Sequence, residues 1–295
     1  MGTFYRRLPK FDYLKPRSLE EVLNLLGGER NGHYRVYAGG TDVIPKLKAR
    51  MMKAPDVLVD LKGIPDMDYI RYDVGSGLRI GALATIFSVA NAPVVKEKYP
   101  ILAMAVGSIA SIQVQNRGTI TGNICNAAPS ADSAPALLCV GARLLCVGKK
   151  GERWINIEEF FKGPSETILN PDELLKEIHI PPMPENSHGV YLKLSPRSKM
   201  DLAVVGVAAV VVAENGFIKD IRIGLGAVAP TPMRARKAED ILGGETANDE
   251  TIKKAALTAS DESKPIDDHR ASAEYRKMMV EVLVERAIRQ ALSVS

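Results

Sequence analysis

Two glycine-containing segments hold the residue types best suited to bind an anionic ligand. The first reads Ala-Gly-Gly-Thr-Asp at residues 38–42, and the second reads Asn-Arg-Gly-Thr-Ile-Thr-Gly-Asn at residues 116–123. Because glycine has no side chain, backbone N–H groups at such turns can approach a ligand closely. Each segment follows an apolar run and leads into a helix-start signal. Together they predict a cradle for one long anionic ligand, such as a dinucleotide with its central pyrophosphate.

Polar side chains in and after the second segment add hydrogen-bonding groups. Thr119, Gly122 and Asn123 can offer hydroxyl, backbone and amide donors to phosphate oxygens. The Asp132 carboxylate can accept from ribose or ring N–H groups, and its alternative role is a helix cap ahead of residues 134–138. Neither segment reads G-x-G-x-x-G, so the sequence lacks a nicotinamide-binding Rossmann fingerprint.

Composition narrows the class of protein. The chain has 295 residues, of which 46% are hydrophobic and 25% charged, as is usual for a soluble protein of two domains or one large one. A net charge of +4 without a dense Lys/Arg run argues against nucleic-acid binding. The longest apolar stretch, residues 203–213, is far shorter than the roughly 20 residues of a membrane helix. With no secretory signal pattern, we expect a cytoplasmic protein.

The cysteines and histidines are too scattered to predict a metal or iron–sulfur centre. Cys125, Cys139 and Cys146 form neither a C-x-x-C pair nor a ferredoxin-like series. We therefore expect no metal ligands in this chain, and we interpret Cys139 and Cys146 as small buried hydrophobic residues.

The elements that would position these segments follow from caps, breakers and periodicity. In the first part of the chain we expect helices over residues 18–26, 41–51, 85–90 and 93–106, strands over 33–37 and 56–61, and a hairpin over 69–82. Residues 107–135 are rich in Ser, Asn, Gly and Pro with little periodicity, which predicts a functional stretch without regular structure. Asn-Pro-Asp-Glu at residues 170–173 predicts a helix start.

A proline cluster at residues 181–184 is the best candidate for a domain boundary. Beyond it, residues 190–194, 203–213 and 217–228 alternate with turns and predict an antiparallel meander. Helical patterns follow over residues 234–242, 249–260 and 273–292. Mixed strands and helices, followed by a sheet and more helices, indicate the α+β class.

The two glycine segments carry a family resemblance. Residues 107–135 resemble the second FAD loop of the molybdenum-hydroxylase flavoproteins, the medium subunits of carbon monoxide dehydrogenase and bacterial xanthine dehydrogenases, and residues 38–42 are similar to the first FAD loop. The likeness continues through Tyr-Leu-Lys at residues 191–193, Arg197, residues 201–205 and the C-terminal signature at residues 226–235. Where the family commonly reads Thr-Ile-Gly-Gly-Asn, this chain has Thr121 in place of the first glycine. That side chain either costs cofactor affinity or adds a hydroxyl contact.

The resemblance implies a fold and a set of cofactor-binding residues. The fold is a vanillyl-alcohol-oxidase (PCMH)-type FAD-binding domain over residues 1–180, with subdomains of about 1–58 and 59–180, and a C-terminal domain over 185–295 with a three-stranded antiparallel sheet and a helical bundle. The residues implied to contact FAD are Val36, Tyr37, Ala38, Gly39, Gly40, Thr41, Asp42, Val43, Ile109, Thr119, Ile120, Thr121, Gly122, Asn123, Asp132, Ile178, Tyr191 and Lys193.

Two of these residues are implied to lie at the flavin ring. Lys193 would stabilise the reduced, anionic ring, and Tyr191 on the same strand face would shield it. The alternatives are a surface lysine on an alternating strand and a core aromatic residue. No catalytic acid or base is expected in this chain, because FAD itself carries the redox chemistry.

The resemblance also implies an oxidoreductase with partner chains. A small subunit with [2Fe–2S] clusters would deliver electrons through FAD to NAD or another acceptor, and a large molybdopterin subunit would oxidise the substrate. The complex would be a heterotrimer or its dimer. One alternative is a free-standing flavin oxidoreductase of the same fold, which would need its own substrate-side base. Another is a non-enzymatic scaffold that has lost FAD. The substrate would be bound on another chain, so this sequence does not identify it.

Overall fold

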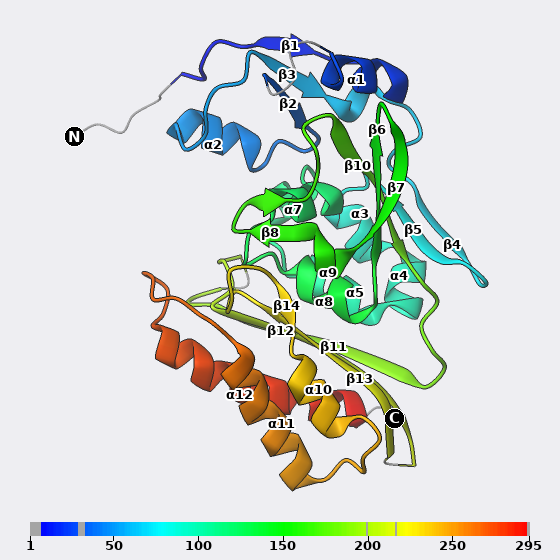
Figure 1. Cartoon of the computed structure of the whole chain (residues 1–295), viewed down its shortest axis with the longest axis vertical. Coiled ribbons are helices and arrows are strands. Elements are labelled where there is room, and N and C mark those ends of the chain that lie inside the picture. The colour runs from blue at the N-terminus through cyan, green and yellow to red at the C-terminus, as the bar shows by residue number, and fades with distance from the viewer. Residues whose placement is uncertain (1–6, 29–32, 199, 216, 294–295) are drawn as a thin grey trace.

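The computed structural model describes residues 7–28, 33–198, 200–215 and 217–293, which form three successive α/β layers (Figure 1). The first layer is a small sheet of three parallel strands in the order β1-β3-β2. Its elements are β1 (Asp12–Leu14), α1 (Leu19–Leu26), β2 (Tyr34–Tyr37), α2 (Val43–Ala49), β3 (Val57–Asp60) and the 3₁₀ turn η1 (Leu61–Gly63). The predicted cap is confirmed, because the Ser18 hydroxyl accepts from the backbone N–H of Glu21.

The second layer is an antiparallel sheet of five strands in the order β4-β5-β10-β6-β7, with helices packed against it. Its strands are β4 (Ile70–Asp73), β5 (Gly77–Gly81), β6 (Arg143–Gly148), β7 (Gly151–Asn156) and β10 (Glu173–Ile180), and β8 (Phe161–Gly163) pairs with β9 (Glu166–Thr167) beside them. Its helices are α3 (Ile86–Asn91), α4 (Pro93–Lys98), α5 (Pro100–Gly107), α6 (Ile112–Gln115), α7 (Ile120–Asn126), α8 (Ser133–Cys139) and α9 (Ile157–Phe160).

The third layer is the predicted meander followed by three helices. Strands β11 (Ser187–Leu194), β12 (Val205–Glu214) and β13 (Phe217–Gly226) pair antiparallel, and a fourth short strand, β14 (Met233–Arg234), adds to the three that were predicted. Helices α10 (Arg236–Leu242), α11 (Asp249–Glu262) and α12 (Ala273–Leu292) follow. The turn between β12 and β13 includes residue 216, which lies outside the described residues.

The third sheet is buried on both faces, which explains the long apolar run in its central strand. Val207 and Ala209 of β12 pack with α10–α12, whereas Ala208 and Val210 pack into the core of the second layer. A strand buried on both faces reads as continuously hydrophobic rather than alternating. The third layer is therefore joined to the second by a shared core (Figure 1).

Three expectations about local structure were wrong. Residues 170–173 form a turn, closed by the N–H of Glu173 donating to the carbonyl of Asn170, and β10 follows instead of a helix. The central place of β10 between β5 and β6 outweighs the local helix-start signal, which proline also gives in turns. The stretch 107–135 contains α6, α7 and the start of α8. The single helix expected over residues 93–106 is two helices, because Pro100 disfavours helical backbone at Tyr99.

Three further observations concern the cysteines, the length of the helices and the grouping of metal-binding side chains. Cys139 and Cys146 are fully buried, as predicted. Among the described helices, none combines the length and apolar character needed to cross a membrane. Over the same ranges, no three His, Cys, Asp or Glu side chains are grouped so that they could hold a metal ion.

Candidate cofactor site

A cavity of about 540 Å³ lies where the two glycine segments meet the start of the third layer. Its volume falls within the roughly 300–1,000 Å³ of small-molecule and cofactor sites. The predicted residues that line it are Val36, Tyr37, Ala38, Gly39, Gly40, Thr41, Asp42, Val43, Ile109, Thr119, Gly122, Asn123, Asp132 and Lys193. The structure thus brings two segments separated by more than seventy residues to one cavity, as the two-loop hypothesis requires.

The first glycine segment connects β2 to α2 and needs both of its glycines. Gly40 has a φ of +78°, and a Cβ there would lie 2.6 Å from the Tyr37 ring. A Cβ on Gly39 would lie 2.0 Å from the carbonyl oxygen of Arg117 in the second segment. Gly39 therefore allows the two loops to touch each other, a role that sequence reasoning had not assigned to it.

The second glycine segment enters α7 through a threonine cap. The Thr119 hydroxyl accepts from the backbone N–H of Gly122 at 3.0 Å. A Cβ on Gly122 would lie 2.8 Å from that hydroxyl oxygen, so the cap and the glycine depend on each other. Because the first N–H groups of a helix have no partner within the helix, this cap satisfies one of them, that of Gly122.

Side chains of α2 and α7 tie the two loops together. The Lys46 ammonium donates to the Asn126 side-chain oxygen at 2.5 Å, and the Asn126 amide nitrogen donates to Asp42 Oδ1 at 3.1 Å. Burial raises the pKa of Asp42, and the charge of Lys46 opposes that rise. Lys46 and Asn126 line the cavity but were not predicted. Lys46 follows Asp42 at helical spacing, which was an available signal.

Asp132 and Lys193, which also line the cavity, form a buried ion pair. Lys193 Nζ lies 2.8 Å from Asp132 Oδ2 and 3.0 Å from the carbonyl oxygen of Ser108, and the Tyr191 hydroxyl donates to Asp132 Oδ1 at 2.7 Å. The Lys193 and Asp132 side chains are only 6% and 7% exposed, so the surface-lysine alternative is wrong. The helix-cap alternative for Asp132 is also wrong, because its side chain caps no backbone N–H of α8.

Burial controls protonation in this cluster. It raises the pKa of the Asp132 carboxyl, and the positive charge of Lys193 opposes that rise. Burial, together with the Asp132 charge, also raises the pKa of Tyr191 far above its ordinary value. The tyrosine therefore keeps its proton and acts as a donor to the carboxylate.

Four predicted residues lie outside the lining of the cavity: Ile120, Thr121, Ile178 and Tyr191. Ile120 and Ile178 are fully buried in the core of the second layer, and Tyr191 reaches the site only through Asp132. The Thr121 hydroxyl donates to the carbonyl of Ala82 at 2.5 Å. The side chain that departs from the family pattern is thus held inside the protein by a backbone acceptor.

The remaining wall comes from residues that the sequence had not singled out as ligands. They are Arg35, Ile86, Ala110, Val114, Gly118, Cys125, Ala128, Ser130, Ala131, Ser165, Met200, Asp201 and Leu202, in addition to Lys46 and Asn126. Residues 200–202 follow β11, so the third layer supplies part of the wall beside Lys193. Most of these side chains are small or apolar and give no chemical signal on their own.

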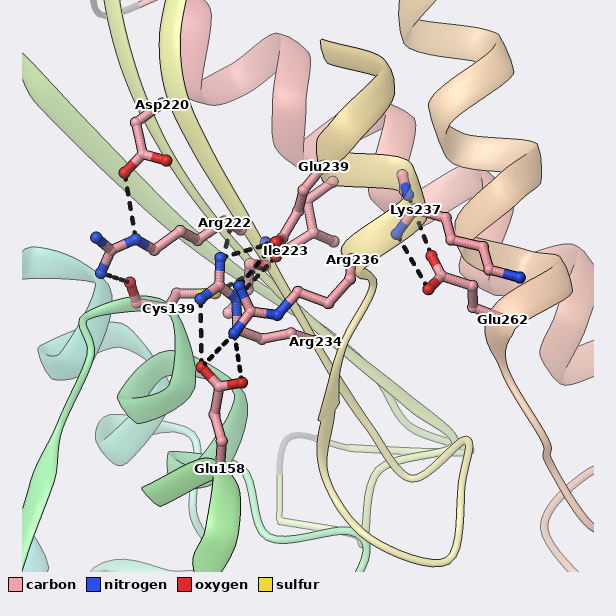
Figure 2. Close-up of polar contacts among 12 residues, drawn as sticks. Cys139, Glu158, Asp220, Arg222, Ile223, Arg234, Arg236, Lys237, Glu239 and Glu262 are labelled. Atoms are coloured by element: carbon pink, nitrogen blue, oxygen red, sulfur yellow. Dashed lines mark hydrogen bonds and ion pairs between the residues drawn. The ribbon is translucent and has the colours of Figure 1, made fainter. Parts of the chain in front are cut away.

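A second polar cluster fixes the third layer against the second (Figure 2). The Arg234 guanidinium in β14 lies 2.7 Å from Glu239 of α10 and 3.3 Å from Glu158 of α9. Arg236 also pairs with Glu158, at 2.6 Å. Figure 2 shows these side chains converging from both layers. The two pairs with Glu158 cross the boundary between the second and third layers, whereas the Arg234–Glu239 pair lies within the third layer.

Comparison with known proteins places this arrangement among FAD-binding subunits. The family described as "FAD binding domain in molybdopterin dehydrogenase" matches residues 9–183, and "CO dehydrogenase flavoprotein C-terminal domain" matches residues 190–291. A glyceraldehyde dehydrogenase medium chain from Sulfolobus acidocaldarius is 34% identical over 96% of this chain and 98% of its own length. The carbon monoxide dehydrogenase medium chain of Hydrogenophaga pseudoflava is 33% identical over 96% of this chain and 97% of its own length.

Solved structures of related enzymes are similar to this chain over nearly its whole length. Carbon monoxide dehydrogenase from Hydrogenophaga pseudoflava matches with a TM-score of 0.93 at 33% identity, over 97% of this chain and 99% of that chain. Quinoline 2-oxidoreductase from Pseudomonas putida 86 matches with a TM-score of 0.90 at 30% identity, over 97% and 98%. Fold and cavity thus define an FAD-binding oxidoreductase subunit. More particularly, the chain belongs to the family of FAD-binding medium subunits of molybdenum hydroxylases, with the carbon monoxide and xanthine dehydrogenase subunits.

Proposed function

We propose that this chain binds FAD in the cavity and serves as the electron-transfer subunit of a molybdenum hydroxylase. Electrons would pass from [2Fe–2S] clusters of a small partner subunit through FAD to NAD or another acceptor. A large molybdopterin subunit would oxidise the substrate, and the three chains would form a cytoplasmic heterotrimer or its dimer. The observation that carries the proposal is the meeting of both glycine segments and the Asp132–Lys193 pair at one cavity.

The residues present fit an extended dinucleotide. Gly39 and Gly40 line the cavity and leave the backbone of the first glycine segment open to it without side chains in the way, which suits a diphosphate. Lys193, also in the lining, offers a positive charge that would stabilise added electron density on the flavin ring. When bound, FAD accepts electrons singly and releases them in pairs, which suits a relay between one-electron and two-electron partners.

The Asp132–Tyr191 contact suggests how Lys193 is held in one orientation. Each Asp132 oxygen already accepts one protein donor, and a carboxylate has room for further donors. We therefore propose that Asp132 orients Lys193 and can also accept from FAD. Ile120, Thr121, Ile178 and Tyr191 would support the site from behind the lining. The domain division at residues 180–185 remains part of this proposal.

Partner chains are supported by the relatives' names. The relatives are a "medium chain" of carbon monoxide dehydrogenase and of glyceraldehyde dehydrogenase, and a "FAD-binding subunit" of xanthine dehydrogenase. The test is to purify the chain from its native host, record its visible spectrum and identify the polypeptides that accompany it. Flavin bands plus iron–sulfur absorbance from a small and a large partner would support the relay.

Two other outcomes would point elsewhere. A stable flavoprotein that is isolated alone and oxidises a small molecule would favour the free-standing oxidoreductase. A colourless, solitary chain that fails to take up added FAD would refute the proposal and leave a scaffold role.

A further inference from the structure

Lys62 contacts the first glycine segment but is not among the described residues that line the cavity. It stands in η1, directly after β3. Its ammonium donates to the Ala38 carbonyl oxygen at 2.7 Å and to Asp60 Oδ1 at 2.8 Å, and it lies 3.8 Å from the centre of the Tyr37 ring. One lysine thus contacts Ala38 of the first glycine segment and Tyr37, the last residue of β2, without itself lining the cavity.

Asp60 anchors this lysine. Its Oδ1 also accepts from the Lys62 backbone N–H at 2.9 Å, and its Oδ2 accepts from the Tyr13 hydroxyl at 2.5 Å. Although burial acts to raise it, the hydrogen bonds from Lys62 and Tyr13 hold the pKa of Asp60 below its ordinary value. The carboxylate is therefore ionised, and it fixes the Lys62 ammonium at the loop.

The Ala38 contact determines which way the following N–H points. The carbonyl of Ala38 and the N–H of Gly39 belong to one peptide unit, and no described peptide bond is cis. In a trans peptide the C=O and N–H point in opposite directions. Because the Ala38 carbonyl points toward the Lys62 ammonium, the Gly39 N–H points away from Lys62. A peptide next to glycine would otherwise rotate easily, since glycine tolerates most backbone angles.

We propose that Lys62 is a positioning residue, which orients the Ala38–Gly39 peptide so that the Gly39 N–H donates to the diphosphate of FAD. This inference rests on the proposed function, because the diphosphate is the ligand group that two glycine loops would hold. Lys62 acts through the backbone and does not itself touch the cofactor. Its loss therefore weakens every ligand that carries a diphosphate, whether or not that ligand carries a flavin.

The test compares FAD with ADP, which has the diphosphate but no flavin, by calorimetric titration of the full-length chain freed of FAD. We expect Lys62→Met to weaken the binding of FAD and of ADP by the same factor, about tenfold, because each complex loses one well-oriented hydrogen bond. Lys62→Gln, which keeps a neutral donor, should give a smaller loss for both ligands and replaces Lys62→Met if that variant is too unstable.

Tyr13→Phe is the matched control. It removes the other hydrogen bond to Asp60 and should lower the melting temperature without changing either affinity. Unchanged ADP and FAD affinities in Lys62→Met and Lys62→Gln would overturn the inference. So would an equal loss of affinity in Tyr13→Phe, which would mean that stability alone is responsible. If the unmodified chain binds neither ligand, the proposed function fails, and this inference fails with it.

Discussion

Replacing Lys193 of the buried Asp132–Lys193 pair separates the structural role of this lysine from its proposed role at the flavin. Both side chains are almost fully buried, at 7% and 6% exposure, so water screens their attraction only weakly. Replacing Lys193 by Met keeps the apolar stem of the side chain but leaves the Asp132 carboxylate buried without its cation. Removing one partner of a buried ion pair costs ~3–5 kcal/mol. We expect Lys193→Met to lose that much free energy of unfolding at neutral pH.

The loss of free energy of unfolding in Lys193→Met should depend on pH in a defined direction. Burial already raises the pKa of Asp132, and removal of the opposing Lys193 charge raises it further. A carboxyl whose pKa is higher in the folded than in the unfolded state binds more protons when folded, so stability rises as the pH falls through that pKa. The deficit of Lys193→Met should therefore shrink on acidification. The double variant with Asp132→Asn should recover much of the deficit, because no buried charge remains.

Urea unfolding of the FAD-free chain between pH 5 and 8 measures the structural role of Lys193. The reduction potential of the bound FAD measures its proposed role at the flavin. If Lys193 also acts at the flavin, its loss lowers the potential, because the reduced anionic ring loses a nearby cation. A Lys193→Met chain as stable as the unmodified chain would refute the buried-pair argument. An unchanged potential would remove Lys193 from the flavin site even if stability falls.

The other predictions concern the loops and a distant ion pair. Gly40→Val and Gly122→Val should abolish FAD binding in fluorescence titrations, because a Cβ at either position would lie closer than 3 Å to other atoms. Circular dichroism should still report a folded C-terminal domain. Tight FAD binding by both variants would refute the two-loop cradle. Thr121→Gly should lower stability by about 1–2 kcal/mol with little change in FAD affinity, because the lost hydroxyl serves a backbone carbonyl outside the lining; a large gain in affinity would contradict this. Hydrogen bonds from Arg270 hold the pKa of Asp268 well below its usual range, so Asp268→Asn should cost about 2 kcal/mol at pH 7. The cost should fall progressively below pH 4, because the carboxyl of the unfolded chain becomes protonated there while the native carboxylate stays ionised; equal costs at pH 7 and pH 3 in urea unfolding would be inconsistent with that account.

The parts of the fold that were predictable are those in which local signals and tertiary packing agree. Helix α1 has a serine cap and a glycine end, and α12 has twenty residues of helical pattern behind the Ser272 cap, so both appear as predicted. The helix expected from residue 170 failed because the same proline and acidic residues also suit a turn. The place of β10 at the centre of a sheet, which no local signal reveals, decides between the two.

The site was predictable where a residue has a chemical reason to be a particular type. The glycines at 39 and 40 could be found because the backbone conformation or a close contact requires them. Lys46 and Asn126 were missed because their contact joins positions eighty residues apart, and neither local pattern predicts the other. Lys62 was missed for a similar reason, since its contact with Ala38 depends on the parallel pairing of β2 and β3.

The alternation along β11 explains why a lysine at position 193 can serve the cavity at all. Val190, Leu192 and Leu194 face the C-terminal helices, whereas Tyr191 packs into the core of the second layer. Because side chains alternate along a strand, Lys193 shares the face of Tyr191 and reaches Asp132 across the boundary between the layers. The third layer therefore supplies part of the cavity wall, in addition to packing its other face against its own helices. A one-residue shift of β11 would turn Lys193 into the helices and leave Asp132 unpaired.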